Sequence, residues 1–287
     1  MRRMLHRVPS YFDTGLWPRR ALGFGTLALC WLFAVFVTVP GSAQPHQEDV
    51  VTIRGGVLRM GGGAEPDEQP RHDVSIATFL IDRFPVTNAE FSEFLNQAGL
   101  RSADGRRHYD DDDNDARIHR REGRLTPDPG FADHPVVEAS WFGARNYCAW
   151  RRARLPTEAE WEFAARGLEG RDFPWGREPP HPGRARFASG WNQTAPIGSH
   201  PAGATPDGVQ DLAGNVHEWT SSLYRSYPYR FDDGREDRDS GEERVTRGGA
   251  HDSSAARLSA TWRGKGVSRS PQAGHHNIGF RCARDMP

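Results

Sequence analysis

The 287-residue sequence has little cysteine and almost no lysine. Lys265 is the only lysine among 37 basic residues, and we attribute this excess of arginine to genome composition rather than to binding chemistry. The formal net charge is −1 and charges of both signs are interspersed, which argues against nucleic acid as a partner. The sequence has no internal repeat, and its one tract of low complexity is the acidic run 110–115.

The one long apolar run lies near the N-terminus, from Ala21 to Val39, after a pair of arginines and before small residues that end at Ala43. This order predicts a secretory leader over residues 1–43. The run is also long enough to span a bilayer as an uncleaved anchor, and the paired arginines allow twin-arginine export. We therefore expect a periplasmic or secreted protein, either free or anchored to the inner membrane by its leader.

Residues 44–287 have the length of one domain with a substantial core. Two cysteines remain there, Cys148 and Cys282, and an exported chain sits where disulfides persist. A bridge closing so long a loop would stabilise the fold by about 2 to 4 kcal/mol. The alternative from the residues alone is two unpaired buried thiols.

Several segments have clear local signals for regular structure. Short apolar runs between polar or glycine-rich breaks predict strands at 50–53, 57–60, 74–76 and 79–82. A capping box opens at Thr87, and apolar residues at helical spacing follow it until Gly99.

Two more helices are expected in the middle of the chain. One starts at Ser140 and ends before Leu155, and the next has Thr157 as its cap and ends at Gly167. The spacing puts three tryptophans on their buried faces, Trp141, Trp150 and Trp161. Beyond Gly167 regular structure is expected to be sparse and braced by aromatic residues, Trp175, Trp191, Trp219 and Trp262.

Five short motifs follow one another between about residues 50 and 285. They are Phe-Pro-Val-Thr-Asn at 84–88, Arg-Leu-Pro-Thr-Glu-Ala-Glu-Trp-Glu at 154–162, Asp-Leu-Ala-Gly-Asn-Val-His-Glu-Trp at 211–219, Arg-Gly-Gly at 247–249 and Gly-Phe-Arg-Cys-Ala at 279–283. In these motifs and their order the chain resembles the sulfatase-modifying-factor, or formylglycine-generating enzyme, family. The resemblance implies an α+β fold, a variant of the C-type-lectin-like fold with little regular secondary structure. It also implies that Cys148 pairs with Cys282.

The third motif carries a candidate calcium site. Its two carboxylates, Asp211 and Glu218, bracket a glycine-containing turn, and carboxylate and carbonyl oxygens are the ligands that calcium prefers. The resemblance implies a structural calcium held by these side chains and by the carbonyls of Gly214 and Val216. The alternative is a metal-free turn in which Glu218 accepts backbone N–H bonds. A second calcium site of the founding enzymes needs an aspartate where Ser189 stands, so we do not expect it.

The acidic run offers another calcium pattern. Asp111, Asp113 and Asp115, with Ile118 and Glu122, have the spacing of an EF-hand loop. Ala116 stands where that loop needs a glycine for its sharp turn. We therefore favour a solvated acidic loop.

The family's founding activity oxidises a cysteine of a sulfatase to formylglycine, with oxygen and with copper(I) held by two cysteines. Alignment on the Arg-Gly-Gly motif puts Ser253 and Leu258 at those two positions, and Ala250 where an active-site serine would be. Soft thiolates are the ligands that copper(I) selects. Their absence argues against the copper mechanism and against formylglycine-generating activity.

Other metal-binding side chains occur in the same region. They are His251, Asp252, His275 and His276. Two histidines and a carboxylate form the triad of non-haem iron oxygenases, although histidines on polar loops are more often surface residues. Which redox metal is bound, if any, stays open. We assign structural roles to His217 and surface roles to Arg263 and Lys265.

Two functions are consistent with these residues. The first is an exported protein, a monomer, that modifies or matures an exported protein, a peptide or a bound small molecule, with oxidation as one chemistry, in a groove around 247–249 and Trp262. In that case the chain is an oxidoreductase of the formylglycine-generating family. The second is a non-catalytic, calcium-braced, lectin-like module that binds a peptide, glycan or protein. The residues leave open whether the chain is an enzyme.

Overall fold

The computed structural model describes residues 50–265, 267 and 270–286. The predicted leader, residues 1–43, lies outside them. These described residues belong to one compact unit. Among the described residues, no helix combines the length and the apolar character needed to cross a bilayer.

The four strands predicted near the start of the chain are confirmed. β1 (Val50–Ile53) and β4 (Phe79–Asp82) pair antiparallel, and β10 (Ala283–Asp285) adds to the other side of β4. β2 (Gly56–Met60) and β3 (His72–Ile76) form a separate hairpin. The first and last described strands therefore share one sheet, which closes the domain.

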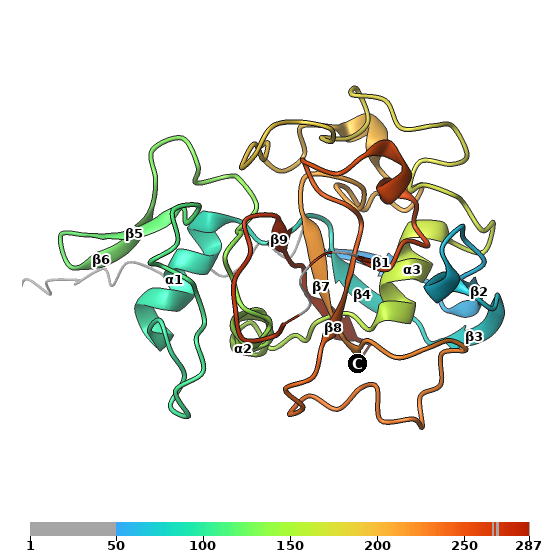
Figure 1. Ribbon diagram of the computed structural model, residues 1–287, viewed down its shortest axis with the longest axis horizontal. Helices are drawn as coiled ribbons and strands as arrows, with labels where there is room; N and C mark the ends of the chain where they lie inside the picture. The colour runs from blue at the N-terminus through green and yellow to red at the C-terminus, as the bar shows by residue number, and fades with distance from the viewer. Residues whose placement is uncertain (1–49, 266, 268–269, 287) are drawn as a thin grey trace, which may run out of the picture. The chain divides into compact units, whose positions relative to one another are not determined.

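A second three-stranded sheet positions the last three of the five motifs. Its central strand β7 (His217–Leu223) is buried at every position. β8 (Arg244–Arg247) pairs with β7 antiparallel, and β9 (Ile278–Gly279) pairs with it in parallel. Each of these three motifs shares residues with one of the strands. The sheet therefore brings the third motif beside the fifth, although more than sixty residues separate β7 from β9 at their starts (Figure 1). An additional hairpin of β5 (Ile118–Arg121) and β6 (Arg124–Pro127), not predicted, packs against the first helix.

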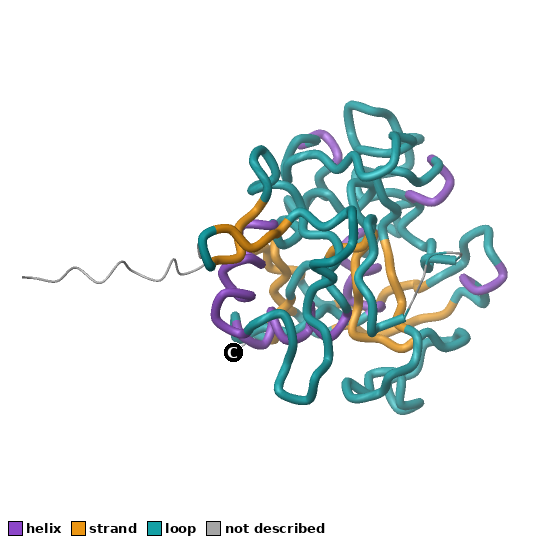
Figure 2. Tube along the Cα trace, turned by 60° about the vertical axis from the view of Figure 1, so that its left-hand side comes forward, coloured by secondary structure: helices purple, strands orange, loops and turns teal. Residues whose placement is uncertain are grey.

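The three predicted helices form with the predicted caps. Both α1 (Asn88–Ala98) and α3 (Glu158–Arg166) open with a complete capping box, and α2 (Trp141–Trp150) is capped by Ser140. Short 3-10 turns occur at Pro66–Glu68, Pro201–Gly203 and Ala255–Leu258. Most of the remaining chain is loop (Figure 2), as the sparse periodicity after Gly167 predicted.

Tryptophan burial follows the prediction with one exception. Trp141 and Trp161 are fully buried, whereas Trp150 is 39% exposed. Trp150 lies in the last turn of α2, where its ring reaches the surface and its indole N–H donates to Gln97 at 3.1 Å. The prediction that Trp150 belongs to the core is therefore wrong.

A disulfide joins Cys148 on α2 to Cys282, as predicted, and closes a loop over a sequence separation of 134 residues. The bridge lies in the larger core cluster, among the aromatic side chains of α1, α2 and β7. A second cluster fills the space between α3 and the two N-terminal sheets. The mixture of sheet and helix with few long elements is the α+β fold that the resemblance implied.

Buried ion pairs, rather than apolar contacts alone, join the motifs. Arg247 donates to Glu162 at 2.6 Å, and Arg263 donates to both oxygens of Glu158 at 2.6 and 3.1 Å. All four side chains are fully buried. The expectation that Arg263 is a surface charge is therefore wrong. Lys265 is exposed and pairs with Glu65 at 2.5 Å.

Candidate functional site

Three of the four residues predicted around 251–252 and 275–276 line one polar cavity of about 280 Å³: Asp252, His275 and His276. His251 is buried and is not one of the lining residues. The Arg-Gly-Gly turn at the end of β8 leads into the first pair, and only Asn277 separates the second pair from β9. Both strands flank β7, and His217 at the start of β7 is aligned with Ile278 of β9. The cavity is lined by His217, Asp252, Ser253, Arg257, Val267, His275, His276 and Asn277.

A carboxylate and an imidazole form the best-defined pair in the cavity. Asp252 lies 3.3 Å from His276 Nε2 and accepts a bond from Asn277 Nδ2 at 3.1 Å. The hydrogen bond from His276 and the nearby imidazole of His251 hold the pKa of Asp252 well below its usual range. Trp191 stacks on His276, with ring centroids 3.5 Å apart, although 65% of Trp191 is exposed.

Three imidazoles here each have a buried ring nitrogen without a hydrogen-bond partner among the described residues. These atoms are His217 Nδ1, His251 Nε2 and His275 Nε2. Burial lowers the pKa of all three groups, and that of His217 falls to about 3. The rings are therefore neutral at pH 7. Because buried polar atoms are normally paired, these nitrogens indicate a bound water, ion or ligand.

The histidines do not form a ready metal centre. Within the described ranges, three side-chain ligand atoms approach within 4.8 Å of one another only at Asp113, Asp115 and Glu138, which belong to a different cluster. His251 Nδ1 is already held at 3.0 Å from the carbonyl of Asn215, and the His251 and His276 rings are 6.2 Å apart. The proposed triad of two histidines and Asp252 is thus brought to one region without the spacing that a single ion needs.

Residues 35–286 match the family described as the Sulfatase-modifying factor enzyme 1-like domain. The chain belongs to this family. It is 33% identical to the inactive C-alpha-formylglycine-generating enzyme 2 of Bos taurus, over 82% of this chain and 87% of that protein. It is also 37% identical to the serine/threonine-protein kinase Pkn1 of Chlamydia trachomatis serovar L2, over 85% of this chain. The chain spans 39% of the length of that kinase relative.

Among solved structures, PvdO from Pseudomonas aeruginosa is similar, with a TM-score of 0.60 and 27% identity. The likeness covers 83% of this chain and 94% of PvdO. A likeness of this extent supports the fold assignment across nearly the whole described part of the chain.

The two positions that correspond to the family's copper cysteines carry no thiol, and one of them lies at the same cavity. Ser253 lines the cavity, and its hydroxyl accepts the N–H of Ala250 at 3.0 Å. Leu258 is fully buried. Cys148 and Cys282 are bonded to each other, so the described residues contain no free thiol.

The family's calcium residues have partners of their own. Glu218 accepts hydrogen bonds from Arg281 at 2.7 and 2.8 Å and from the indole of Trp161 at 2.8 Å. Its donors are therefore side chains, and not the backbone N–H groups that the metal-free alternative predicted. Asp211 accepts the N–H of Gly198 at 2.7 Å. Burial raises the pKa of Asp211, and the charge of Glu218 adds to this effect.

These contacts fit a cation at Asp211 better than at Glu218. Glu218 already has a cationic partner, whereas Asp211 forms no ion pair with the described residues. The carbonyl of Gly214, one of the expected ligands, accepts the N–H of Val216 at 2.9 Å. A carbonyl oxygen has a second lone pair for a cation. Calcium at Asp211, Gly214, Val216 and Glu218 stays a prediction.

The structure contains a second carboxylate cluster, of which the sequence analysis identified only the two aspartates. Asp113 and Asp115 of the acidic run come within 4.8 Å of Glu138, which precedes α2. Burial and the neighbouring aspartates raise the pKa of Glu138 to about 8. In the sequence, the spacing of an EF-hand loop pointed to Glu122 as the last ligand. No sequence pattern links Glu138 to the acidic run, because Glu138 lies more than twenty residues after it.

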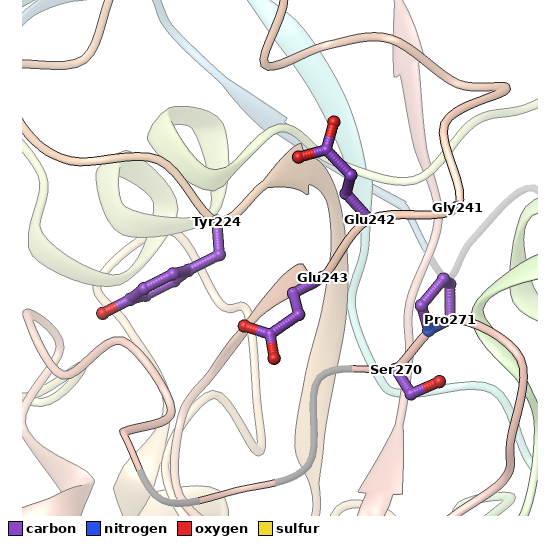
Figure 3. Close-up of a pocket in the computed structure, with 6 residues that line it drawn as sticks. All are labelled: Tyr224, Gly241, Glu242, Glu243, Ser270 and Pro271. Carbon is purple, nitrogen blue, oxygen red and sulfur yellow. The ribbon is translucent and has the colours of Figure 1, made fainter.

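Two further cavities lie outside the histidine cavity. One of about 470 Å³ includes Trp262 and shares Arg257 with the histidine cavity, but Arg247 of the predicted groove is fully buried in the ion-pair network. Another of about 440 Å³ lies near Tyr224 and Glu242 (Figure 3). Glu242 is held by Arg225, and Tyr224 donates to Asp67. Trp262 of the predicted groove thus lines a cavity that shares Arg257 with the histidine cavity, and a groove around 247–249 stays a prediction.

Proposed function

We propose that this chain is an exported maturation protein of the sulfatase-modifying-factor family that binds a polar side chain of a partner polypeptide in the histidine cavity. The observation that carries the proposal is that this cavity has a serine and imidazoles where the resemblance implies a copper-binding thiol. Ser253 stands at a position that the resemblance assigns to a copper cysteine, and two neutral imidazoles with an unpaired nitrogen, His217 and His275, line the same cavity. Such atoms can donate to or accept from a polar ligand at no cost in charge burial.

Within this proposal His276 is the proton acceptor. Asp252 is positioned to orient its imidazole and to stabilise the imidazolium, since the two groups lie 3.3 Å apart and the Asp252 carboxylate stays ionised. Trp191 covers one face of the His276 ring. The pair would deprotonate a hydroxyl, thiol or ammonium group presented by the partner.

A redox metal would need the cavity to rearrange. Copper or iron would supply oxygen chemistry when bound, and His251, Asp252 and His276 are the residues that would hold it. Their present spacing does not meet the requirement of one ion, so no step is assigned to a metal.

Export is supported by the disulfide, because structural disulfides persist in oxidising compartments. A partner made in the same compartment is the simplest substrate. The Arg257 side chain at the cavity edge would favour a segment with negative charge.

A second function, a binding module without catalysis, is favoured by the missing thiols and by the spacing of the described histidine-cavity residues, which is too wide for a single redox metal. The two functions share the pocket and differ in whether the partner is changed. A photo-crosslinking residue in place of Val267 would capture the bound segment in cells, and mass spectrometry would compare that segment between wild type and His276→Ala.

A mass change present with wild type and absent with His276→Ala would support maturation. Capture without a mass change would support the binding module. Equal capture from a crosslinker at His119, a partly exposed residue of β5, would contradict both. Elemental analysis of the same preparations would reveal a redox metal, and loss of stoichiometric iron or copper in His276→Ala would show that the cavity closes around an ion.

A further inference from the structure

We infer that Asp113, Asp115 and Glu138 form a calcium site, separate from the one predicted at 211–218 and from the histidine cavity. Their ligand oxygens all lie within 4.8 Å of one another. Calcium holds oxygens at about 2.3 to 2.6 Å, so two oxygens on one ion are at most about 5 Å apart. The observed spacing therefore suits a single calcium ion without movement of the chain.

Glu138 is the residue that distinguishes this cluster from an ordinary acidic surface loop. Only 2% of it is exposed, and its carboxylate accepts no hydrogen bond and forms no ion pair among the described residues. The carboxylate faces Asp113 and Asp115, both of which add negative charge. Buried polar side chains in proteins are normally hydrogen-bonded, and Glu138 has no protein partner in the described part of the chain. A cation between the three carboxyl groups would stabilise the ionised form of Glu138.

The backbone fixes Glu138 in this position. Its N–H donates to the carbonyl of His275 at 3.1 Å, and its carbonyl accepts the N–H of Asp110 at 2.9 Å. Its φ of 59° lies in the left-handed region, which side chains other than glycine and asparagine rarely adopt. Gly274 packs against it so closely that an added Cβ would lie 2.2 Å from the Glu138 carbonyl oxygen.

The loop supplies the other two ligands in an ordered form. The N–H of Asp115 donates to Asp113 at 2.8 Å, which holds the two aspartates on the same side of the turn. Asp115 also accepts from Trp191 at 2.9 Å and from Asn192 at 3.0 Å. A carboxylate has about four acceptor positions, so these bonds leave room for an ion.

The choice of calcium rests on the ligands. Three carboxylates and no imidazole or thiol are a hard donor set, and carbonyls or water would complete six to eight ligands. Magnesium requires near-ideal octahedral geometry at about 2.0 to 2.1 Å, which a loop and a distant glutamate are less suited to provide. The site replaces the EF-hand pattern of the sequence, in which Glu122 would have been the last ligand.

Terbium luminescence tests this site directly. Trp191 donates to Asp115, so light absorbed by its indole would be transferred to a terbium ion bound there. The chelator-treated protein should show a saturable signal that calcium displaces. Glu138→Gln and Asp113→Asn should weaken binding by about tenfold or more. In an Asp211→Asn background, which removes the other predicted site beside Trp161, Trp191→Phe should lose the signal and still bind calcium.

Matched variants separate the alternatives. Asp111→Asn removes a charge from the same loop outside the cluster and should leave binding unchanged, as should Asp211→Asn at the other predicted site. Unchanged calcium and terbium affinity in Glu138→Gln would overturn the proposal. Displacement of terbium by magnesium at the same concentration as calcium would also overturn it, because the site would then not prefer calcium. Since Asp113 lies on an exposed loop, Asp113→Asn gives the same test if Glu138→Gln does not fold.

Discussion

The guanidinium of Arg281 donates to both carboxylate oxygens of Glu218, at 2.8 Å to Oε2 and 2.7 Å to Oε1. Arg281 belongs to the last of the five motifs and Glu218 to the third. The indole of Trp161, from the second motif, donates to the same carboxylate at 2.8 Å. Three of the five motifs thus meet at one buried carboxylate, and these contacts involve no thiol.

Removing one partner of this pair should cost much of the domain's stability. Arg281→Met leaves the buried carboxyl group of Glu218 without its cationic partner, and we expect a loss of about 3 to 5 kcal/mol in the free energy of unfolding. Urea denaturation with chelator present measures this loss. Arg59→Met, which breaks an exposed pair with Asp73, should cost no more than about 1 kcal/mol.

The double variant Arg281→Met with Glu218→Gln should recover part of the loss, because no unpaired charge remains. An equal loss in Arg281→Met and Arg59→Met would contradict the assigned role of the buried pair.

The local elements were predictable because their signals lie within a few residues of one another. The capping boxes at Thr87 and Thr157 contain both of their partners, and the structure forms both. The disulfide came from family resemblance, since spacing alone does not pair cysteines 134 residues apart.

The errors concern contacts between distant segments. An arginine such as Arg263 is usually found at the surface, but here its guanidinium is buried because it pairs with Glu158 on α3. Trp150 has helical spacing, but it falls at the helix end, where the core no longer covers it. Glu138 has no local signal at all, because its neighbours are brought by a loop that ends more than twenty residues earlier. Each of these depends on tertiary structure, which periodicity does not encode.

The stability of the domain should depend on the ionisation of Glu68. This side chain is 2% exposed, and burial raises its pKa despite the hydrogen bond from Thr261. A raised pKa in the folded state means that the protonated form is favoured there. The stabilising contribution is thus fully present below the ordinary pKa of about 4.3 and is lost as pH rises through the folded-state pKa.

Glu68→Gln carries no charge at any pH, so it should raise the free energy of unfolding at pH 7 relative to wild type and have less effect near about pH 4, below the ordinary glutamate pKa. Urea denaturation at both pH values measures the difference. Glu93→Gln, on the exposed face of α1, should show no such pH-dependent gain. A Glu68→Gln variant that is less stable than wild type at pH 7 would contradict the prediction.

The calcium site predicted at 211–218 can be tested apart from the acidic loop. In a Glu138→Gln background, which removes the loop site, calcium should still raise the melting temperature. Adding Asp211→Asn should abolish that rise, because Asp211 is the carboxylate without a cationic partner among the described residues. Differential scanning calorimetry with and without chelator gives the result. A melting temperature independent of calcium in Glu138→Gln would leave the turn metal-free.

Trp191 connects the acidic loop with the histidine cavity, since it donates to Asp115 and stacks on His276. Because 65% of Trp191 is exposed, Trp191→Ala should change the free energy of unfolding by no more than about 0.5 kcal/mol. The His276 ring would lose its cover, so its modification by diethyl pyrocarbonate should become faster. Mass spectrometry of each histidine over time measures the rate.

Trp150→Ala is the matched control, because Trp150 is also a partly exposed tryptophan but lies on α2. It should leave the His276 rate unchanged. If Trp191→Ala also leaves that rate unchanged, the stack does not shield the imidazole. If calcium slows the reaction of His276 in wild type and not in Trp191→Ala, the acidic loop controls access to the cavity through this one indole.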